Sequence, residues 1–214
     1  MIEIDHIVLG CATLAQGARF VEDQLGAAPL PGGAHAGMGT HNLLLGLGAA
    51  CYLEVIAPDP EQPDPPRPRL FGLDDAKLRR ALARRPRLVG YVARTSGLAA
   101  LAARLGPARL PAPFAMRRGD LSWRMALFAP GPHGQDPLVP GLIEWEGRGA
   151  AARLPDSGCR LLELQAEHPD PAALRAVLAD CGLLRLVGVR ESASPRFTSR
   201  LQGLGGREVT FATD

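Results

Sequence analysis

The sequence predicts an α+β protein built from three repeats of one β-α-β-β-β unit. Alternating, β-branched runs such as residues 3–10 predict strands, and amphipathic runs such as residues 13–25 predict helices. The same order of elements recurs from residue 87 and again from residue 159. Each unit is too small to bury its own sheet face, so we expect the units to pack together as cupped, mixed, mostly antiparallel sheets.

The individual elements support this organisation. In the first unit, Thr13 is a suitable N-cap for the helix. After the helix come a glycine-rich strand and then the strands 40–48 and 51–57. In the third unit, Asp170 and Pro171 predict the start of a helix. The predicted first module covers residues 1–58, and a proline-rich linker with a short helix covers 59–86. The second module covers 87–148 and the third covers 158–214.

Composition excludes several classes of protein. The 214 residues are 46% hydrophobic and 21% charged, which is typical of a globular chain. Glycine and proline together number 45, from 25 and 20, which predicts many turns. The densest group of arginines, between residues 79 and 87, contains no aromatic residue, so nucleic-acid binding is not expected.

The same composition predicts a cytoplasmic protein. No secretory segment opens the chain, and no apolar stretch approaches the roughly 20 residues of a membrane span. The four cysteines form no CxxC pair, which disfavours a zinc–thiolate site and fits reduced thiols.

Two carboxylates stand within apolar strands, each in the last strand of its module. Glu54 shares a strand face with Tyr52, and Glu144 shares one with Leu142. A carboxylate on a buried face costs several kcal/mol unless it is paired or bound to metal. Two interpretations therefore stay open. Either the strand faces that carry Glu54 and Glu144 are exposed to solvent, or the two carboxylates form one site from equivalent positions of two modules.

His6, in the first strand, would complete such a site. With Glu54 and Glu144 it gives one imidazole and two carboxylates, which suit a divalent Zn, Ni, Mn, Fe or Mg ion. The alternative is that His6 is a structural strand histidine and that no ion binds.

Four segments resemble the glyoxalase-like branch of the vicinal oxygen chelate superfamily. They are DHIVLGC, GTHNLLLGLGAACYLEVIAPDP, LSWRMALFAPGP and PLVPGLIEWEGR, at residues 5–11, 39–60, 121–132 and 137–148. The resemblance implies paired βαβββ modules that form a cupped sheet around a divalent metal. It also implies that His6, Glu54 and Glu144 are metal ligands. The fourth ligand position falls on Gly90, beside Tyr91, and glycine has no side chain to donate.

Further residues are candidates for the cup. His41 is either an acid/base group, together with Glu144, or an edge-strand polar residue. Asn42 and Tyr91 are predicted to contact substrate, and so are Trp123 and Arg124, of which alternation allows only one to face inward. His35 lies in a glycine-rich loop, as a lid or with no role. His168 precedes the third helix, and no role is assigned to His133.

Three functions follow from the resemblance. The first is a metal-dependent lyase or isomerase, or a dioxygenase-like enzyme, that chelates two oxygens of a small metabolite. The second is a metal-free protein that binds or sequesters a small molecule, as drug-resistance members of the superfamily do. The third is a non-catalytic subunit, and the unmated third module predicts a homodimer.

Overall fold

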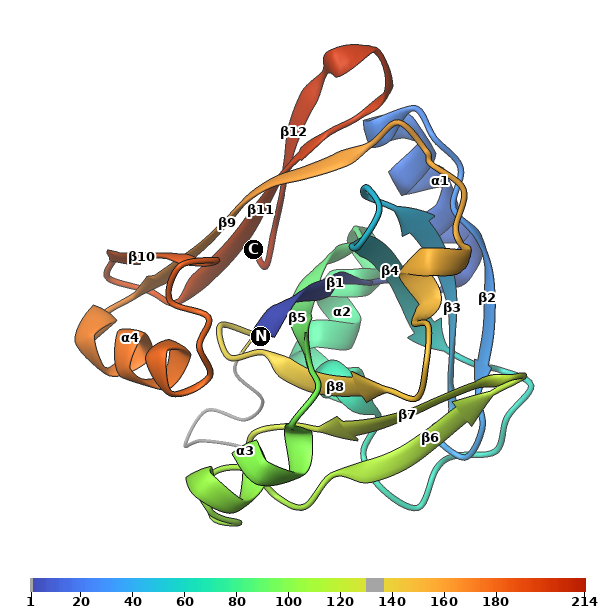
Figure 1. Ribbon diagram of the computed structural model, residues 1–214. Helices are drawn as coiled ribbons and strands as arrows, with labels where there is room; N and C mark the ends of the chain where they lie inside the picture. Colours follow the sequence, from blue (N-terminus) through green and yellow to red (C-terminus); the bar gives the residue numbers. More distant parts are fainter. Residues whose placement is uncertain (1, 130–136) are drawn as a thin grey trace.

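A computed structural model describes residues 2–129 and 137–214, which form two sheets (Figure 1). The larger sheet has eight strands in the order β2-β3-β4-β1-β5-β8-β7-β6 and curls into a cup. Its strands, in chain order, are β1 (Ile2–Gly10), β2 (Leu30–His35), β3 (Thr40–Gly46), β4 (Tyr52–Pro58), β5 (Arg87–Thr95), β6 (Phe114–Arg118), β7 (Leu121–Ala126) and β8 (Gly141–Trp145). The predicted fold class is confirmed.

The two modules meet at the antiparallel pair β1–β5. His6 lies opposite Val92, and Val8 lies opposite Gly90. The pairing is reciprocal, because Gly90 and Val92 lie 84 residues after His6 and Val8, respectively. In each module the first and last strands pair in parallel, β1 with β4 and β5 with β8. The large sheet therefore has an approximate twofold relation, in which His6 corresponds to Gly90.

Helices cover both faces of the large sheet. Their bounds are α1 (Leu14–Leu25), α2 (Ala76–Arg84), α3 (Leu98–Leu105) and α4 (Pro171–Asp180). Thr13 caps α1 by accepting the Gln16 N–H, and Asp170 caps α4 by accepting the Ala173 N–H. α1 and α4 therefore begin where short polar side chains satisfy a first-turn N–H group.

Strand alternation sorts the apolar side chains into two cores. Ile7, Leu53 and Leu142 point to the face that α1 and α3 cover. Val8, Ile56 and Ile143 point to the concave face, where they pack with α2 and the short helix η1 (Leu70–Gly72). The linker predicted between the first two modules thus helps to close the cup.

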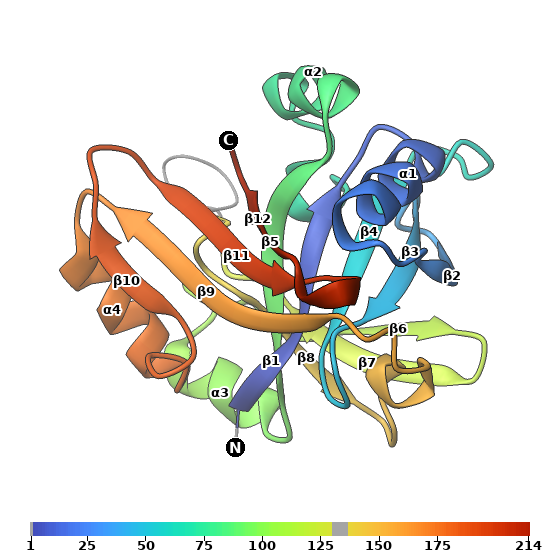
Figure 2. The ribbon, with the colours of Figure 1, turned by 90° about the horizontal axis from the view of Figure 1, so that it is seen from above.

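The third module forms a separate four-stranded sheet in the order β10-β9-β11-β12 (Figure 2). Its strands are β9 (Arg160–His168), β10 (Gly188–Glu191), β11 (Arg196–Gln202) and β12 (Glu208–Ala212). Phe197 stacks on Tyr91 with ring centroids 4.7 Å apart, and Phe211 packs against Phe20. Because this sheet buries its apolar face against the first two modules, the reason for expecting a homodimer does not hold, and oligomeric state stays a prediction.

Two further sequence expectations concern the membrane and the thiols. Over the described ranges, no helix has the length and apolar character needed to cross a bilayer. Cys11, Cys51, Cys159 and Cys181 are free thiols.

Candidate functional site

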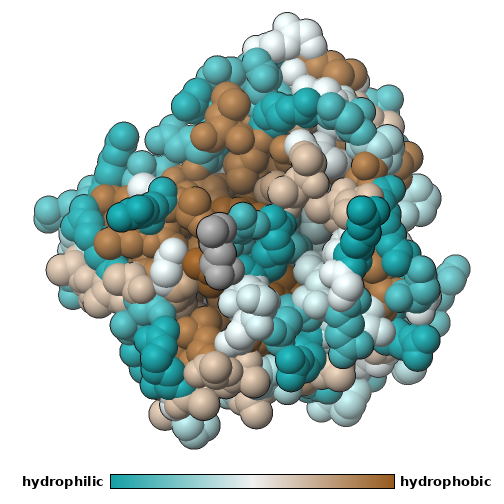
Figure 3. Space-filling view, in the orientation of Figure 1, coloured by the Kyte–Doolittle hydropathy of each residue, from teal (hydrophilic) through white to brown (hydrophobic). Residues whose placement is uncertain are grey.

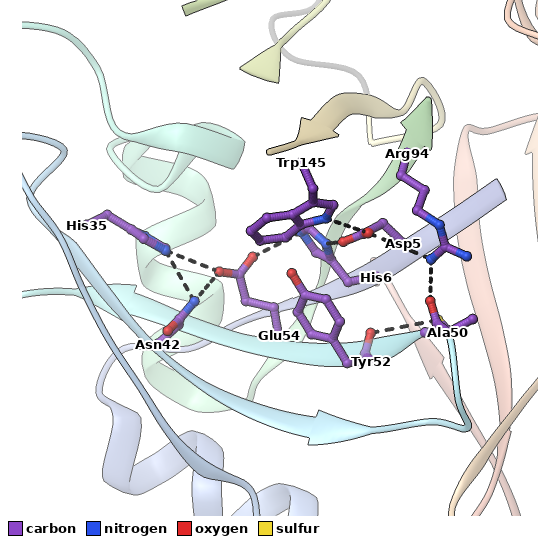
Figure 4. A network of polar contacts seen from close by, with 10 residues as sticks. Asp5, His6, His35, Asn42, Ala50, Tyr52, Glu54, Arg94 and Trp145 are labelled. Carbon is purple, nitrogen blue, oxygen red and sulfur yellow. Dashed lines mark hydrogen bonds and ion pairs between the residues drawn. The ribbon is translucent and has the colours of Figure 1, made fainter. Parts of the chain in front are cut away.

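A cluster of polar side chains lies on the concave face of the first module (Figure 4). It contains one residue from each of four adjacent strands: His6 from β1, His35 from β2, Asn42 from β3 and Glu54 from β4. All four are buried, with 3 to 5% of their surface exposed. Strand alternation places Asn42 and Glu54 there, because their neighbours along β3 and β4 point to the opposite face.

Glu54 is the centre of the cluster. His6 Nε2 lies 3.4 Å from Glu54 Oε2, and His35 Nε2 lies 3.6 Å from Oε1. Asn42 Nδ2 donates a hydrogen bond of 2.5 Å to Oε1. The carboxylate buried in an apolar core is therefore compensated by two donors, the His6 imidazolium and the Asn42 amide.

Hydrogen bonds orient the second imidazole and the amide. Asn42 Nδ2 lies 3.2 Å from His35 Nε2, which makes that nitrogen an acceptor and leaves the proton on Nδ1. His35 Nδ1 then donates to Thr40 Oγ1 at 2.9 Å. Arg118, from β6 of the second module, donates to Asn42 Oδ1 at 2.8 Å. His35 is thus held in its neutral form.

Asp5 reaches the cluster from the position next to His6. A register irregularity between Ile4 and His6 interrupts the β1–β5 ladder at this point. Such a bulge lets two consecutive side chains act on one site. Asp5 Oδ1 contacts His6 Nδ1 at 2.7 Å, and Oδ2 accepts the Trp145 indole N–H at 2.9 Å.

These contacts fix the charges of the cluster. Burial alone would lower the pKa of His6, but the hydrogen bonds and charges of Asp5 and Glu54 raise it to about 9. Burial alone would raise the pKa of Glu54, but the hydrogen bond and charge of His6 lower it to about 2. Burial lowers the pKa of His35. At neutral pH, His6 and Glu54 are an ion pair and His35 is uncharged.

The remainder of the cup wall is aromatic and apolar. Tyr52 stacks on His6 with centroids 4.6 Å apart, and Trp123 packs against Trp145 at 5.2 Å. Met125 and Phe71 close the other sides. The cavity measures about 30 Å³, the room of about one water molecule, so a larger ligand enters only when a wall side chain moves.

The predicted grouping of Glu144 with His6 and Glu54 is wrong. Glu144 shares its strand face with Leu142, which belongs to the core under α1 and α3, and it pairs with Arg124 outside the cup. Pairing explains the error: Glu54 lies opposite Val8, and the corresponding position opposite Val92 is Gly141. Glu144 lies three residues further along, and an odd offset turns a strand side chain to the other face.

The structure places the other predicted residues on both faces of the large sheet. Asn42 and Trp123 line the cup, whereas Arg124 points away from it. Tyr91 lies on the opposite face, where its hydroxyl donates to the Leu138 carbonyl. His41 also lies outside the cup, with Nδ1 3.7 Å from Asp59.

Sequence reasoning missed three members of the cluster: Asp5, His35 and Arg118. The signal for His35 is its position across a glycine turn from Thr40, because these two residues pair in the β2–β3 hairpin. Arg118 carried no signal, since only the curl of the sheet brings β6 beside β2. His168 accepts the Asp170 N–H at the start of α4, and His133 lies outside the described residues.

The superfamily resemblance implies a divalent metal, which the donor groups do not fit. In the second module the positions equivalent to His6 and Glu54 are both glycines, Gly90 and Gly141. A Cβ at Gly90 would lie 3.1 Å from Phe71, and one at Gly141 would lie 3.1 to 3.2 Å from three side chains, so neighbours already fill both places. Within residues 2–129 and 137–214, no three or more His, Cys, Asp or Glu side chains are arranged to hold a metal ion.

Comparison with known proteins defines the class. A family model for the glyoxalase-like domain matches residues 4–182, so this chain belongs to the glyoxalase-like domain family. Among curated proteins, no sequence matches significantly.

Solved structures are similar to this chain at low sequence identity. A hypothetical protein from Staphylococcus aureus has a TM-score of 0.59 at 14% identity, over 99% of this chain and 85% of that one. Methylmalonyl-CoA epimerase from Mycobacterium tuberculosis has a TM-score of 0.47 at 23% identity, over 70% of this chain and 91% of that one. The hypothetical protein BH1468 from Bacillus halodurans C-125 has a TM-score of 0.47 at 15% identity, over 69% and 96%.

Proposed function

We propose that this protein binds a small molecule carrying a neutral oxygen group, such as a ketone, in the cup of the large sheet, without a metal ion. The observation that carries the proposal is the division of the cup into a polar end, built by His6, Asn42 and Glu54, and an aromatic wall that contains Trp123 and Trp145. A few convergent polar groups within an apolar lining are characteristic of small-molecule sites.

The charges of the cup favour a neutral ligand. Asp5 and Glu54 carry two negative charges, and His6 and Arg118 carry two positive ones, so they cancel. Arg94, 3.8 Å from Asp5, is balanced by its own pair with Glu3. A ligand carboxylate or ammonium would add a buried charge with no free partner, which is costly. A carbonyl or hydroxyl oxygen instead needs one donor, and the His6 Nε2–H, whose contact with Glu54 is long at 3.4 Å, can be shared with it.

Glu54 and His35 set how that donor behaves. The carboxylate keeps His6 protonated, and the neutral His35 adds no further charge beside it. The metal-dependent lyase or isomerase implied by the superfamily would need donors where Gly90 and Gly141 stand. We therefore place the metal-free binding function ahead of it for this chain.

Chemical shifts of the two indole N–H groups test the proposal. The chain has two tryptophans, and both line the cup, so each indole signal reports on it. We expect hexan-2-one to shift both signals and hexanoate, of equal chain length, to bind at least about tenfold more weakly. His6→Gln should weaken hexan-2-one binding, whereas Glu144→Gln, which lies outside the cup, should not.

Two results would contradict the proposal. One is equal binding of hexanoate and hexan-2-one, because it would show that charge does not govern selection. The other is binding of hexan-2-one that survives His6→Gln but requires added Zn²⁺ or Ni²⁺, which would restore the metal-dependent function.

A further inference from the structure

Phe71 separates the polar cup from a second, larger cavity. This second cavity, here called the apolar chamber, measures about 330 Å³ and is lined mainly by apolar residues, among them Val89, Leu127, Phe128 and Val139. Among the described residues, Phe71 alone lines both cavities. One aromatic side chain therefore contacts both spaces.

The apolar chamber occupies the second module's counterpart of the polar cluster. Gly90 and Gly141, which correspond to His6 and Glu54, both line it. β8 pairs with β5 only along Val92–Arg94, so the β5 edge at Gly90 faces the chamber instead of a neighbouring strand. Apolar surface gathers near the centre of the face shown in Figure 3, where the two sheets approach each other.

Phe71 is held in an unfavourable backbone conformation. Its φ of 58° and ψ of 27° lie in the left-handed region, and no other non-glycine residue of the described chain has a positive φ. For a bulky side chain this conformation is a genuine outlier, of the kind that clusters at ligand clamps and switches.

The strain is confined to a short turn. Arg69 is fixed on one side by its ion pairs to Asp64 and Asp74, and Asp75 caps α2 on the other. Gly72, with a φ of 67°, follows Phe71 directly. The turn from Leu70 to Leu73 can therefore change conformation, and carry the ring of Phe71 away from Gly90, while both anchors stay in place.

We propose that Phe71 is a movable partition, and that its displacement joins the cup and the apolar chamber into one elongated ligand site. The inference rests on the proposed binding function and extends it to a ligand class. The ligand has a neutral oxygen group that reaches His6 and an apolar chain or ring that fills the chamber. With the ring of Phe71 displaced, the joined space falls in the range of ordinary ligand sites, about 300 to 1,000 Å³.

Charge supports this choice of ligand. Arg109 is the one charged residue that lines the chamber in the described chain, and it is half exposed and paired with Asp180 at 2.9 Å. Among the described residues, the chamber thus has no buried charged side chain in its lining. Shape and lining favour a linear or ring-bearing apolar tail.

Acrylamide quenching of tryptophan fluorescence tests the partition independently of any ligand. In a Trp145→Phe background, Trp123 is the single tryptophan and is 5% exposed, so its quenching measures access to the cup. Phe71→Gly suits the positive φ and should raise the quenching constant at least about threefold. Phe128→Ala enlarges only the chamber and should leave quenching unchanged. Equal quenching in Phe71→Gly and the parent would overturn the partition.

Gly90→Ala gives a second, milder test that leaves Phe71 intact. Its new methyl group would lie 3.1 Å from the Phe71 ring, so the ring must move. We expect Trp123 quenching between that of the parent and that of Phe71→Gly. A folded Gly90→Ala protein with parental quenching would show that the ring does not open the cup when displaced.

A series of methyl ketones tests whether the two cavities act as one site. From butan-2-one to octan-2-one, affinity should rise about fourfold for each added methylene, because the lengthening chain enters the chamber. Octan-2-one should associate with Phe71→Gly at least about tenfold faster than with the parent protein. Phe128→Ala should reduce the gain per methylene.

The outcomes separate the two proposals. Affinity that is independent of chain length in both the parent and Phe71→Gly would overturn the joined site while leaving ketone binding in place. If no ketone binds but Phe71→Gly still raises quenching, the proposed function fails and the partition stands.

Discussion

The two halves of the cup come from equivalent modules but have opposite chemistry. In the first module, His6 and Glu54 face the cup from the first and last strands and form a buried ion pair. In the second module, the equivalent positions are Gly90 and Gly141, and apolar side chains fill the space above them. The same backbone therefore carries a charged end and an apolar end.

This difference shows how a repeated fold can lose a shared site without losing its architecture. Main-chain pairing across β1–β5 and the parallel pairs in each module are kept, because they depend on the backbone. Glycine at two positions removes the donors, and Gly90 leaves room for Phe71. Each prediction below compares the charged end with a matched position elsewhere.

The largest effect is expected when the two repeat glutamates are compared. Glu54→Gln removes one of the two carboxylate partners of buried His6 and should cost about 3 to 5 kcal/mol of unfolding free energy. Glu144→Gln removes a partner of half-exposed Arg124 and should cost less than about 1 kcal/mol. Urea unfolding of both variants measures the difference. Equal losses would mean that the two carboxylates have equivalent environments.

Stability should depend on pH through His6. Its pKa is raised from 6.5 to about 9, so its contribution is fully present below pH 6.5 and is lost as pH rises through 9. The loss amounts to about 3 kcal/mol for an isolated group. We expect stability to fall between pH 6.5 and 9 in the parent protein and to change much less in His6→Gln. Parallel pH profiles would refute the ion pair.

Glu54 produces the opposite dependence at low pH. Its pKa is lowered from 4.5 to about 2, so its contribution is fully present above pH 4.5 and is lost as pH falls through 2. Glu54→Gln should therefore flatten the acid limb of the stability profile, whereas Glu144→Gln should follow the parent. Denaturant unfolding between pH 2 and 5 provides the measurement.

A smaller effect is expected at the joint between the two ends. Trp145→Phe keeps an aromatic wall but removes the indole N–H that donates to Asp5. Loss of a hydrogen bond to a charged acceptor should cost about 1.5 to 3 kcal/mol. The pKa of His6, followed by its ring NMR signals, should stay raised, because Asp5 and Glu54 remain. A return of that pKa to 6.5 would show that Trp145, and not the two carboxylates, keeps the pKa of His6 raised.

The smallest effect is expected from metal ions. Because glycines occupy positions 90 and 141, where the second module would supply ligands, Zn²⁺, Ni²⁺ or Mn²⁺ should change the melting temperature of the parent protein by less than about 2 °C, and Glu54→Gln should respond identically. Calorimetry after dialysis against a chelator provides the reference state. A stabilisation that disappears in Glu54→Gln would establish a metal site at the charged end.

Much of the architecture could be predicted from the sequence, because local patterns determine it. Alternation placed Glu54 on one face with Tyr52, and Thr13 and Asp170 marked helix starts that the structure has. Alignment of the two repeats makes His6 equivalent to Gly90. The reciprocal pairing across β1–β5 agrees with that equivalence. These features depend on neighbours within a few residues, or on similarity between modules.

Tertiary structure alone decided which residues meet in the cup. Alternation predicts which residues of β8 share a face with Glu144. It does not predict whether that face lines the cup, because the register of β8 against β5 determines the face. A bulge in β1 turned Asp5 toward His6, and the curl of the sheet brought Arg118 to Asn42. Likewise, only the packed structure shows that a strained Phe71 stands over a glycine and divides one cup into two cavities. Strand identity is a local property, whereas register, bulges and sheet curvature depend on contacts between distant segments.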